Sequence, residues 1–184
     1  MKILSLENLP EVKILRPYKL EDHRGFFSET YNYQQLKNLG EELKFVQDNQ
    51  SLSRDRYTLR GLHFQSPPFA QDKLIRVLRG SVLDVAVDVR KNSKTFGKHA
   101  AVKLSASEFN QILVPKGFAH GFLTLEENTE IFYKVTNYYS KEHDLGIAWN
   151  DPTLKINWGV SAEELKIAEK DQNQPNFDLL GDYF

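Results

Sequence analysis

The hydrophobic positions of this chain follow a β-strand pattern over most of its length. From Phe45 onward, short runs rich in Val, Ile, Leu, Phe and Tyr alternate with turn residues, which is typical of successive strands. The pattern predicts eight strands, at residues 45–50, 58–65, 73–79, 81–89, 100–104, 110–114, 120–125 and 130–138. Because no helical segment interrupts this series, we predict a mainly β protein, built as a sandwich, jelly roll or barrel.

The region before these strands predicts a hairpin-like start and a short helix. Residues 11–20 read as an opening strand, and a polar turn then returns the chain in extended conformation as far as Tyr31. Asn32 is a favourable N-cap, Gln35 follows three residues later, and Gly40 suits the left-handed position at the helix end.

The C-terminal region predicts a second helix and a packed tail. Ser161 and Glu164 form a capping-box signature, and the helix that they start ends at Lys170 and Asp171. Trp158 precedes this helix as an expected packing anchor, and the final residues are too apolar for a free tail. No repeat or linker divides the chain, so we predict one domain over residues 1–184.

The segment at residues 81–89 has one aliphatic face and one acidic face. Its Leu and Val residues alternate with Asp84 and Asp88, as strand geometry allows. The two aspartates fit either a polar cavity or a solvated outer face of the sheet. On this segment alone the solvated position is the commoner one, and we expect it.

Composition and charge exclude several functions. The formal net charge is −1, so no global field attracts nucleic acid or anionic membranes. The chain contains no cysteine, which excludes disulfides, thiolate catalysis and cysteine-bound metals. The N-terminus lacks a signal-peptide pattern, and no apolar stretch of about 20 residues is present. We therefore expect a cytoplasmic protein without a nucleic-acid or membrane partner.

The candidate chemistry gathers on four of the predicted strands. Arg60 and His63 lie on one strand segment and Lys73 begins the next, while His120 follows the motif PKGFA and Tyr133 lies in an aromatic strand. Proton-handling and anion-binding side chains of this kind are seldom needed for folding alone. We predict that these five residues line one pocket.

Strict strand alternation raises a difficulty for this pocket. It places Arg60 and His63 on opposite faces of their strand. Both side chains reach one pocket only if Gly61 permits a bulge or a local twist.

The order of the two histidine motifs resembles the cupin superfamily of small β-barrels. Metal-binding cupins carry a second His two residues after the first and a Glu on the next strand, but this chain has Gln65 and Lys73 at those positions. Because a lysine cation repels a divalent metal and two histidines are too few ligands, we predict a pocket without metal or cofactor.

A pocket of this composition suits proton transfer beside a carbonyl group. His63 is the natural general base, and Tyr133 is a natural acid partner. Lys73 or Arg60 can stabilise the enolate oxygen that forms between the two proton transfers. Taken singly, each of these residues also fits a purely structural role.

Seven motifs in the right order resemble the dTDP-4-dehydrorhamnose 3,5-epimerase family. They are DHRGFFSETYN, FVQDNQS, LRGLHFQ, LDVAVDVRKNSKTFG, PKGFAHGFLTL, YKVTNYY and WNDPTLKINW, and the similarity runs from about residue 3 to residue 175. The resemblance implies a cupin-like jelly-roll barrel with short flanking helices, a homodimer, no metal, and a thymidine-diphosphate sugar as substrate.

The resemblance also implies roles for individual residues. His63 would remove the protons at C3 and C5, Asp171 would orient its ring, Tyr133 would deliver protons from the opposite face, and Lys73 would hold the C4 oxygen. Further residues would bind the sugar, diphosphate or nucleotide: Arg24, Glu29, Gln47, Asn49, Arg60, His120, Asp144 and Lys170. The segment from Arg24 to Glu29 is expected to reach into the neighbouring subunit. Within this family, Asp84 is expected to face the pocket, and no role is assigned to it.

Two other functions fit the same residues. A related epimerase that inverts only one centre would also need His63 and Tyr133. A non-catalytic cupin would use the same side chains only to hold a sugar. The stereochemistry of the product separates the first alternative, and solvent-proton exchange separates the second.

Overall fold

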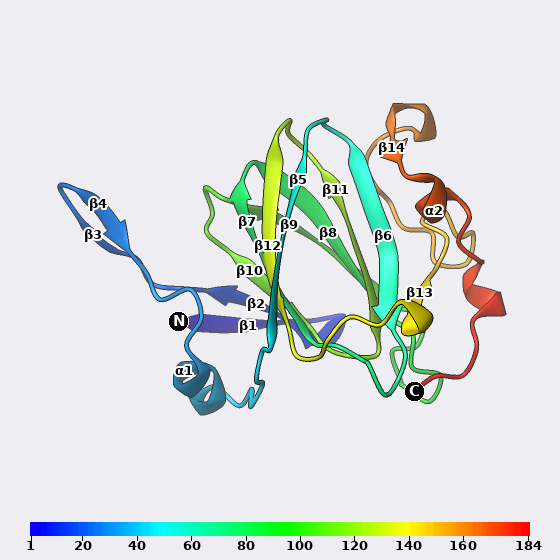
Figure 1. Cartoon of the computed structure of the whole chain (residues 1–184), viewed down its shortest axis with the longest axis horizontal. Helices are drawn as coiled ribbons and strands as arrows, with labels where there is room; N and C mark the ends of the chain where they lie inside the picture. Colours follow the sequence, from blue (N-terminus) through cyan, green and yellow to red (C-terminus); the bar gives the residue numbers. More distant parts are fainter.

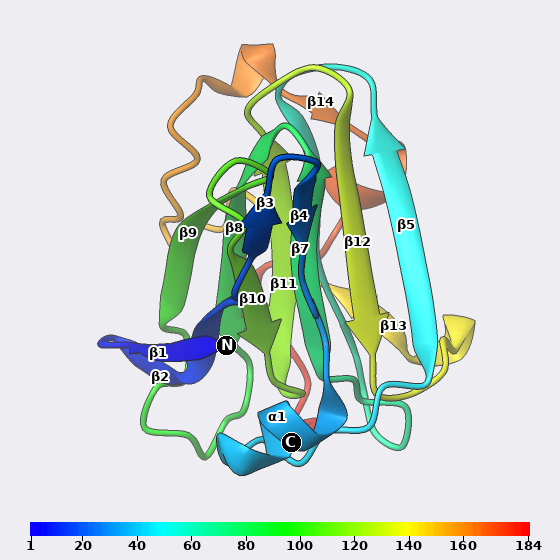
Figure 2. The ribbon, with the colours of Figure 1, turned by 90° about the vertical axis from the view of Figure 1, so that its left-hand side faces the viewer.

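The computed structural model describes residues 1–184 and contains two facing β-sheets (Figure 1). The first sheet has the order β1-β2-β10-β7-β12-β5, with strands Lys2–Leu6, Leu9–Arg16, Gln111–Val114, Lys73–Arg79, Thr129–Val135 and Gln47–Ser53. The second has the order β13-β6-β11-β8-β9, with strands Asp144–Gly146, Thr58–Gln65, Phe118–Thr124, Ser81–Asp88 and His99–Ser105. Figure 2 shows β7, β12 and β5 side by side in the first sheet.

Strand alternation gives each sheet an inner and an outer apolar face. The inner faces pack together in a cluster that includes Ile75 and Ile131 from the first sheet and Val82 and Phe122 from the second. The outer face of the second sheet is covered by the C-terminal segment, where Trp158 is almost completely buried and donates from Nε1 to the Trp149 carbonyl. The predicted mainly β, jelly-roll fold is confirmed, and so is the anchoring role of Trp158.

The eight predicted strands are all present, with ends that shift by up to three residues. The pattern missed the first strand, β1, which pairs antiparallel with β2. It also missed the short strands β13 and β14 (Lys166–Ile167), which pair with β6. These two strands are too short to show an alternating pattern in the sequence.

Only the turn end of the predicted hairpin forms a separate two-stranded arm, because most of the predicted opening strand belongs to β2 in the first sheet. Strands β3 (Leu20–Asp22) and β4 (Gly25–Phe27) pair only with each other and extend away from the sheets (Figure 1). Helix α1 (Tyr33–Asn38) follows, and the Asn32 side chain accepts from the Gln35 N–H at 3.1 Å, as an N-cap does. The arm carries exposed aromatic side chains, which makes it a candidate contact surface.

The predicted C-terminal helix is wrong as a single element. The capping box of Ser161 is formed, but it starts only a 3-10 turn (Ala162–Glu164). The chain then forms β14 beside β6 and continues as the short helix α2 (Glu169–Gln172). The apolar side chains of Leu165 and Ile167 pack against the second sheet, so burial overrides the local helical signal. The chain has two further 3-10 turns, Lys141–His143 before β13 and Phe177–Leu179 near the C-terminus.

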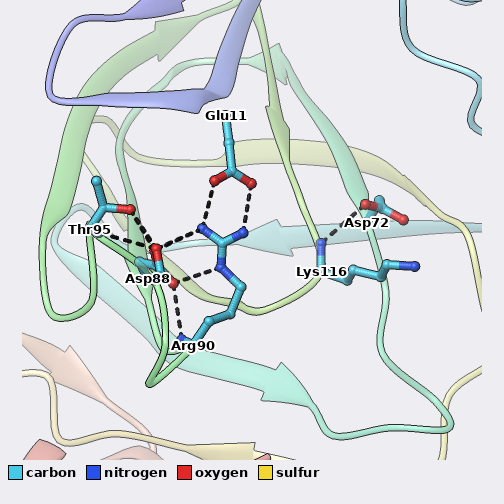
Figure 3. A network of polar contacts seen from close by, with 7 residues as sticks. Glu11, Asp72, Asp88, Arg90, Thr95 and Lys116 are labelled. Carbon is cyan, nitrogen blue, oxygen red and sulfur yellow. Dashed lines mark hydrogen bonds and ion pairs between the residues drawn. The ribbon is translucent and has the colours of Figure 1, made fainter. Parts of the chain in front are cut away.

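The expected exposure of Asp84 and Asp88 is wrong, because both side chains are completely buried. Asp88 is held by Arg90, Ser93 and Thr95, with a distance of 2.8 Å between Arg90 Nη2 and its Oδ2 atom (Figure 3). The expectation failed because both faces of β8 are covered, one by the first sheet and the other by the C-terminal segment.

The Asp88 carboxylate is part of a polar network between the two sheets. Arg90 also donates to both oxygens of Glu11 on β2, at 2.6 and 2.8 Å (Figure 3). Burial alone would raise the pKa of Asp88, but hydrogen bonds from Arg90, Ser93 and Thr95 lower it below its ordinary value.

None of the helices combines the length and apolar character that crossing a membrane requires.

Candidate active site

A cavity of about 350 Å³ opens between the two sheets. It is lined by Ser51, Arg60, His63, Lys73, Ile75, His120, Gly121, Phe122, Ile131, Tyr133, Ala168, Lys170 and Asp171. All five residues that the strand pattern assigned to one pocket are therefore in it. The cavity combines an apolar wall with several converging ionisable groups, as substrate pockets commonly do.

A β-bulge brings Arg60 and His63 to the same face. The register of β6 with β11 shifts by one residue between the pair His120–His63 and the pair Phe122–Arg60. Gly61 lies at the shift with φ +113°, and a Cβ atom there would come within 2.6 Å of Gly121 Cα. Only glycine fits this conformation and this close approach. The condition that the sequence set for a common pocket is met.

His63 and Asp171 form a buried pair on one side of the cavity. The His63 Nε2 atom lies 2.6 Å from Asp171 Oδ1, and the Gly61 N–H donates to the other carboxylate oxygen at 3.2 Å. Burial alone would raise the pKa of Asp171, but hydrogen bonding to His63 lowers it below its ordinary value. The His63 side chain stays 28% exposed, so one face of its ring is open to a ligand. The carboxylate fixes the orientation of the ring.

Tyr133 and Lys73 approach the same cavity from the first sheet. Tyr133 lies on β12 and Lys73 begins β7, whereas Arg60, His63 and His120 come from the second sheet. Burial raises the pKa of Tyr133, so its phenol keeps a proton that it can donate. Burial lowers the pKa of Lys73 to about 8, while nearby carboxylates oppose this shift. Lys73 is therefore a cation that can readily interact with a developing negative charge.

His120 forms a second pair with an aspartate. Its Nε2 atom lies 3.0 and 2.9 Å from the two carboxylate oxygens of Asp84. The sequence assigned no role to Asp84, because alternation identified the face it occupies but not what that face meets. Ser51 on β5 also lines the cavity and was not predicted; its small polar side chain gave no signal.

The match with known proteins decides the family. Residues 7–178 match the family model described as dTDP-4-dehydrorhamnose 3,5-epimerase. The chain belongs to the dTDP-4-dehydrorhamnose 3,5-epimerase family. The resemblance in the seven sequence motifs is confirmed, and the chain is an isomerase of this epimerase family.

Relatives in this epimerase family match almost the whole chain. The dTDP-4-dehydrorhamnose 3,5-epimerase of Sinorhizobium fredii is 48% identical over 92% of this chain and 86% of its own length. The crystal structure of the Bacillus anthracis enzyme with TDP and PPi bound has a TM-score of 0.91 and 47% identity, covering 95% of this chain and 98% of its own. The Legionella pneumophila 3,5-epimerase in complex with dTDP-4-keto-L-rhamnose has a TM-score of 0.92 and 40% identity, covering 98% and 94%.

Two residues that the epimerase resemblance implied lie at the rim of the cavity. Lys170 Nζ pairs with Asp144 Oδ2 at 2.5 Å, and the Tyr139 hydroxyl donates to the same oxygen at 3.2 Å. The hydrogen bond with Asp144 raises the pKa of Lys170, which keeps this lysine charged beside Asp171. Lys170 lines the cavity directly, whereas Asp144 is attached to it through Lys170.

The other implied contacts do not line this cavity. Gln47 and Asn49 are hydrogen-bonded to each other on β5, where Asn49 is the register partner of Tyr133. Glu29 accepts from Gln35 beside helix α1. Arg24 lies on the arm, its side chain is 78% exposed, and it pairs only with Asp22. Within one chain, the structure does not bring Arg24 and Glu29 to the other site residues.

Gln65 has a structural role in this epimerase, although cupins carry a metal ligand at its position. Its side-chain amide donates to the carbonyls of Phe69 and Tyr138, and its oxygen accepts from the Ser140 N–H. The side chain therefore joins the strand β6 to two loops. Lys73 occupies the position of the cupin glutamate ligand, and its cationic side chain disfavours binding of a divalent ion.

Proposed function

We propose that the chain catalyses epimerisation at C3 and C5 of dTDP-4-dehydro-6-deoxy-D-glucose, giving dTDP-4-dehydro-L-rhamnose. Relatives with that activity in their names share 44–48% of its residues, and a similar structure contains dTDP-4-keto-L-rhamnose. The observation that carries the proposal is that His63 and Tyr133 line one cavity from different sheets. Inversion of a carbon needs a base on one face of the sugar and an acid on the other, and this arrangement supplies both.

The reaction begins with proton abstraction by His63. The C4 carbonyl of the sugar acidifies the C–H bonds at C3 and C5, because the resulting carbanion is an enolate. The Nδ1 atom of His63, the ring nitrogen that Asp171 does not hold, takes the proton, and Asp171 at 2.6 Å from Nε2 stabilises the imidazolium that forms. Negative charge moves onto the C4 oxygen at the same time. No redox step is involved.

Lys73 stabilises the enolate. Its ammonium group extends into the cavity from the first sheet and lies 3.4 Å from the His63 carbonyl, so its position beside the base is fixed. A cation in a desolvated site interacts with an oxyanion more strongly than it does in water. The gain is largest when the charge has moved to oxygen, which lowers the barrier to abstraction.

Tyr133 completes the inversion. Its phenol delivers a proton to the carbanion on the face opposite to His63, and the phenolate that remains lies near the positive charge of Arg60. Solvent then returns a proton to Tyr133 and accepts one from His63, so the enzyme ends in its initial state. The same cycle at the second carbon gives the doubly inverted sugar.

The anionic part of the substrate is held by local positive charges. Arg60, His120 and Lys170 surround the cavity, although the chain has a formal net charge of −1. Arginine and lysine bind phosphate oxygens through charge-assisted hydrogen bonds. We assign the sugar and diphosphate to these residues, and the nucleotide to Gln47, Asn49, Asp144 and the arm. We also propose that the enzyme works in the cytoplasm, since it needs no disulfide.

We further infer a homodimer in which the arm of one chain completes the site of the other. The arm residues Phe26 and Phe27 are 54% and 65% exposed, and Arg24 has no contact with its own cavity. Beneath the arm lies a space of about 590 Å³. Three buried polar atoms around this space, Ser28 Oγ, Arg76 Nε and Gln111 Oε1, have no hydrogen-bond partner. A second copy that covers this face would supply contacts for the exposed side chains of the arm and for the three unpaired polar atoms.

Solvent deuterium incorporation tests the proposed function. The protein is treated with EDTA and incubated with dTDP-4-dehydro-6-deoxyglucose in D2O, and the sugar is read by mass spectrometry and proton NMR. We expect label at both C3 and C5, and the L-rhamnose configuration after reductive trapping. Label at one carbon would identify a single-centre epimerase, and binding without label would identify a sugar-binding protein.

A further inference from the structure

His120, which lines the cavity, pairs with the buried Asp84, beside the pair that His63 forms with Asp171. His120 on β11 is the direct register partner of His63 on β6, so the two imidazoles are cross-strand neighbours. Each ring uses its Nε2 atom to contact a carboxylate. The His120 side chain is only 10% exposed, compared with 28% for His63. His120 is therefore the more confined of the two rings.

The two carboxylates differ in their support. Asp171 accepts from the Gly61 N–H as well as from His63. Asp84 is completely buried, and all of its hydrogen bonds come from the Nε2 atom of His120. A buried carboxylate without a nearby positive charge is strongly unfavourable. His120 and Lys73 are the basic groups near Asp84: burial lowers the pKa of Lys73 to about 8, and the nearby carboxylates Asp144 and Asp84 oppose this shift.

The hydrogen bond to Asp84 determines what His120 can offer to a ligand. With Nε2 held by the carboxylate, Nδ1 is the ring nitrogen that remains free. In a neutral ring with the proton on Nε2, Nδ1 only accepts a hydrogen bond. In the imidazolium form, Nδ1 is a charged donor. A charged donor is the form that an oxygen gaining negative charge would need.

We propose that Asp84 is a positioning residue for the epimerisation: it orients His120 and sustains the positive charge with which Nδ1 donates to the C4 oxygen. Lys73 from the first sheet and His120 from the second then contact that oxygen together. This inference rests on the proposed function, because the C4 oxygen becomes an enolate only in that reaction. It assigns Asp84, which contacts no substrate, an effect on turnover.

A double-mutant cycle tests whether Asp84 acts through His120. Asp84→Asn keeps the shape of the side chain and removes its charge. We expect kcat to fall about 10- to 100-fold with KM changed less than about twofold, because the lost interaction is strongest in the transition state. In the His120→Gln background, Asp84→Asn should cause no further loss. If the fold-losses in kcat of the two single variants multiplied in the double variant, the two residues would act independently and the inference would be overturned.

Asp88→Asn is the matched control. Asp88 lies on the same strand and the same face, is equally buried, and bonds to Arg90, Ser93 and Thr95 instead of the cavity residues. We expect this variant to lower the midpoint of unfolding and to leave kcat unchanged. If Asp88→Asn lowered kcat as much as Asp84→Asn does, the effect would be a general one of buried charge, and the inference would fail.

A measurement without substrate separates this inference from the proposed function. In 15N-labelled protein, the imidazole nitrogens of His120, assigned by comparison with His120→Gln, should show a proton held on Nε2 and a shift toward the imidazolium. Both features should be lost in Asp84→Asn and kept in Asp88→Asn. Identical His120 signals in wild type and Asp84→Asn would overturn the inference, even if the wild type exchanged protons at both carbons. A wild type that exchanged no proton would instead refute the proposed function.

Discussion

His63 and Asp171 lie 2.6 Å apart in the cavity, although 108 residues separate them in the chain. The contact exists because α2 returns to strand β6 after the 3-10 turn and β14 have covered the second sheet. The carboxylate is almost completely buried and receives the Gly61 N–H as a second donor. The proposed role of His63 as the base therefore depends on the docking of the C-terminal segment.

Asp171→Asn should lower kcat by about a thousandfold while the protein stays folded. The amide keeps the volume of the carboxylate but cannot stabilise an imidazolium, and loss of a buried orienting aspartate costs up to about 10⁴ in comparable dyads. Steady-state kinetics and dTDP binding measured by calorimetry check this. The exposed Asp178 offers a matched control, and Asp178→Asn should behave as wild type. A nearly unchanged kcat in Asp171→Asn would remove this residue from the mechanism.

Tyr133→Phe should separate proton removal from inversion. His63 can still abstract and return a proton on its own face, so solvent deuterium should enter the substrate without a change of configuration. Proton NMR of the recovered sugar and reductive trapping measure the two outcomes. The rate of L-sugar formation should fall by about 10² or more, the usual contribution of a general acid. Full epimerisation by the variant would exclude Tyr133 as the acid.

Lys73 should give the reaction an alkaline limit. Its pKa of about 8 means that the free enzyme loses this charge as the pH rises through about 8, so kcat/KM should fall there. Lys73→Arg keeps a charge that does not titrate in this range, and its profile should stay flat to higher pH, at a lower plateau. Lys73→Met should lose about 10² in kcat, whereas the exposed control Lys116→Met should not. An unchanged alkaline limit in Lys73→Arg would assign it to another group.

Mixed dimers should reveal whether the arm acts on the neighbouring chain. Arg24→Ala has a complete cavity and a defective arm, whereas His63→Ala has the reverse. Reassembling the two inactive variants at equal amounts should restore about a quarter of wild-type activity, since half of the dimers are mixed and each has one complete site. Mixing His63→Ala with Lys73→Met is the control and should restore nothing. The same lack of recovery with Arg24→Ala would contradict an arm that acts in trans.

Arg90→Met should destabilise the fold without affecting turnover. It removes the link from Glu11 to Asp88 and leaves the Asp88 carboxylate with only neutral donors: the hydroxyls of Ser93 and Thr95 and the backbone N–H of residue 90. Because breaking a buried pair exposes the cost of the remaining charge, we expect a loss of about 2 to 3 kcal/mol in the free energy of unfolding. Urea denaturation measures this, with the exposed Lys91→Met as control.

The acid behaviour of Arg90→Met follows from the same carboxylate. The pKa of Asp88 in the folded protein is lowered from 3.8, so its contribution to stability is present above that pH and is lost as the pH falls through the folded value. Without Arg90 the folded pKa rises, and acid unfolding should begin at higher pH than in wild type. Identical acid midpoints for the two proteins would refute this account of the network.

The strand pattern predicted most of the fold, because period-2 alternation records which residues share a face. The five side chains of the cavity were predicted from their chemical types, and alternation alone would have separated Arg60 from His63, which a bulge brings together. The alternation does not show which elements pack against each face. Asp84 illustrates this limit, since both faces of β8 are covered and only the assembled sheets show it. The site roles of His63, Tyr133 and their neighbours remain predictions until they are tested.

Contacts between distant segments were not accessible to the pattern. Asp171 was assigned through family resemblance alone, because nothing in its local sequence points to His63. The capping box at Ser161 predicted a helix that the structure replaces with a 3-10 turn and a strand. Here the burial of Leu165 and Ile167 outweighed a local signal worth about 1 kcal/mol.

The proposed base and the proposed acid lie on different sheets, so the distance between them depends on the thickness of the apolar layer between the sheets. Ala86 is completely buried in that layer, together with Val82 and Ile112. Protein interiors are close-packed, so an added methyl group must push the walls apart or distort them. The width of the proposed sugar site is therefore set by side chains that do not contact the sugar. Substitutions that change the volume of these side chains would change the rate of inversion without altering any residue that lines the cavity.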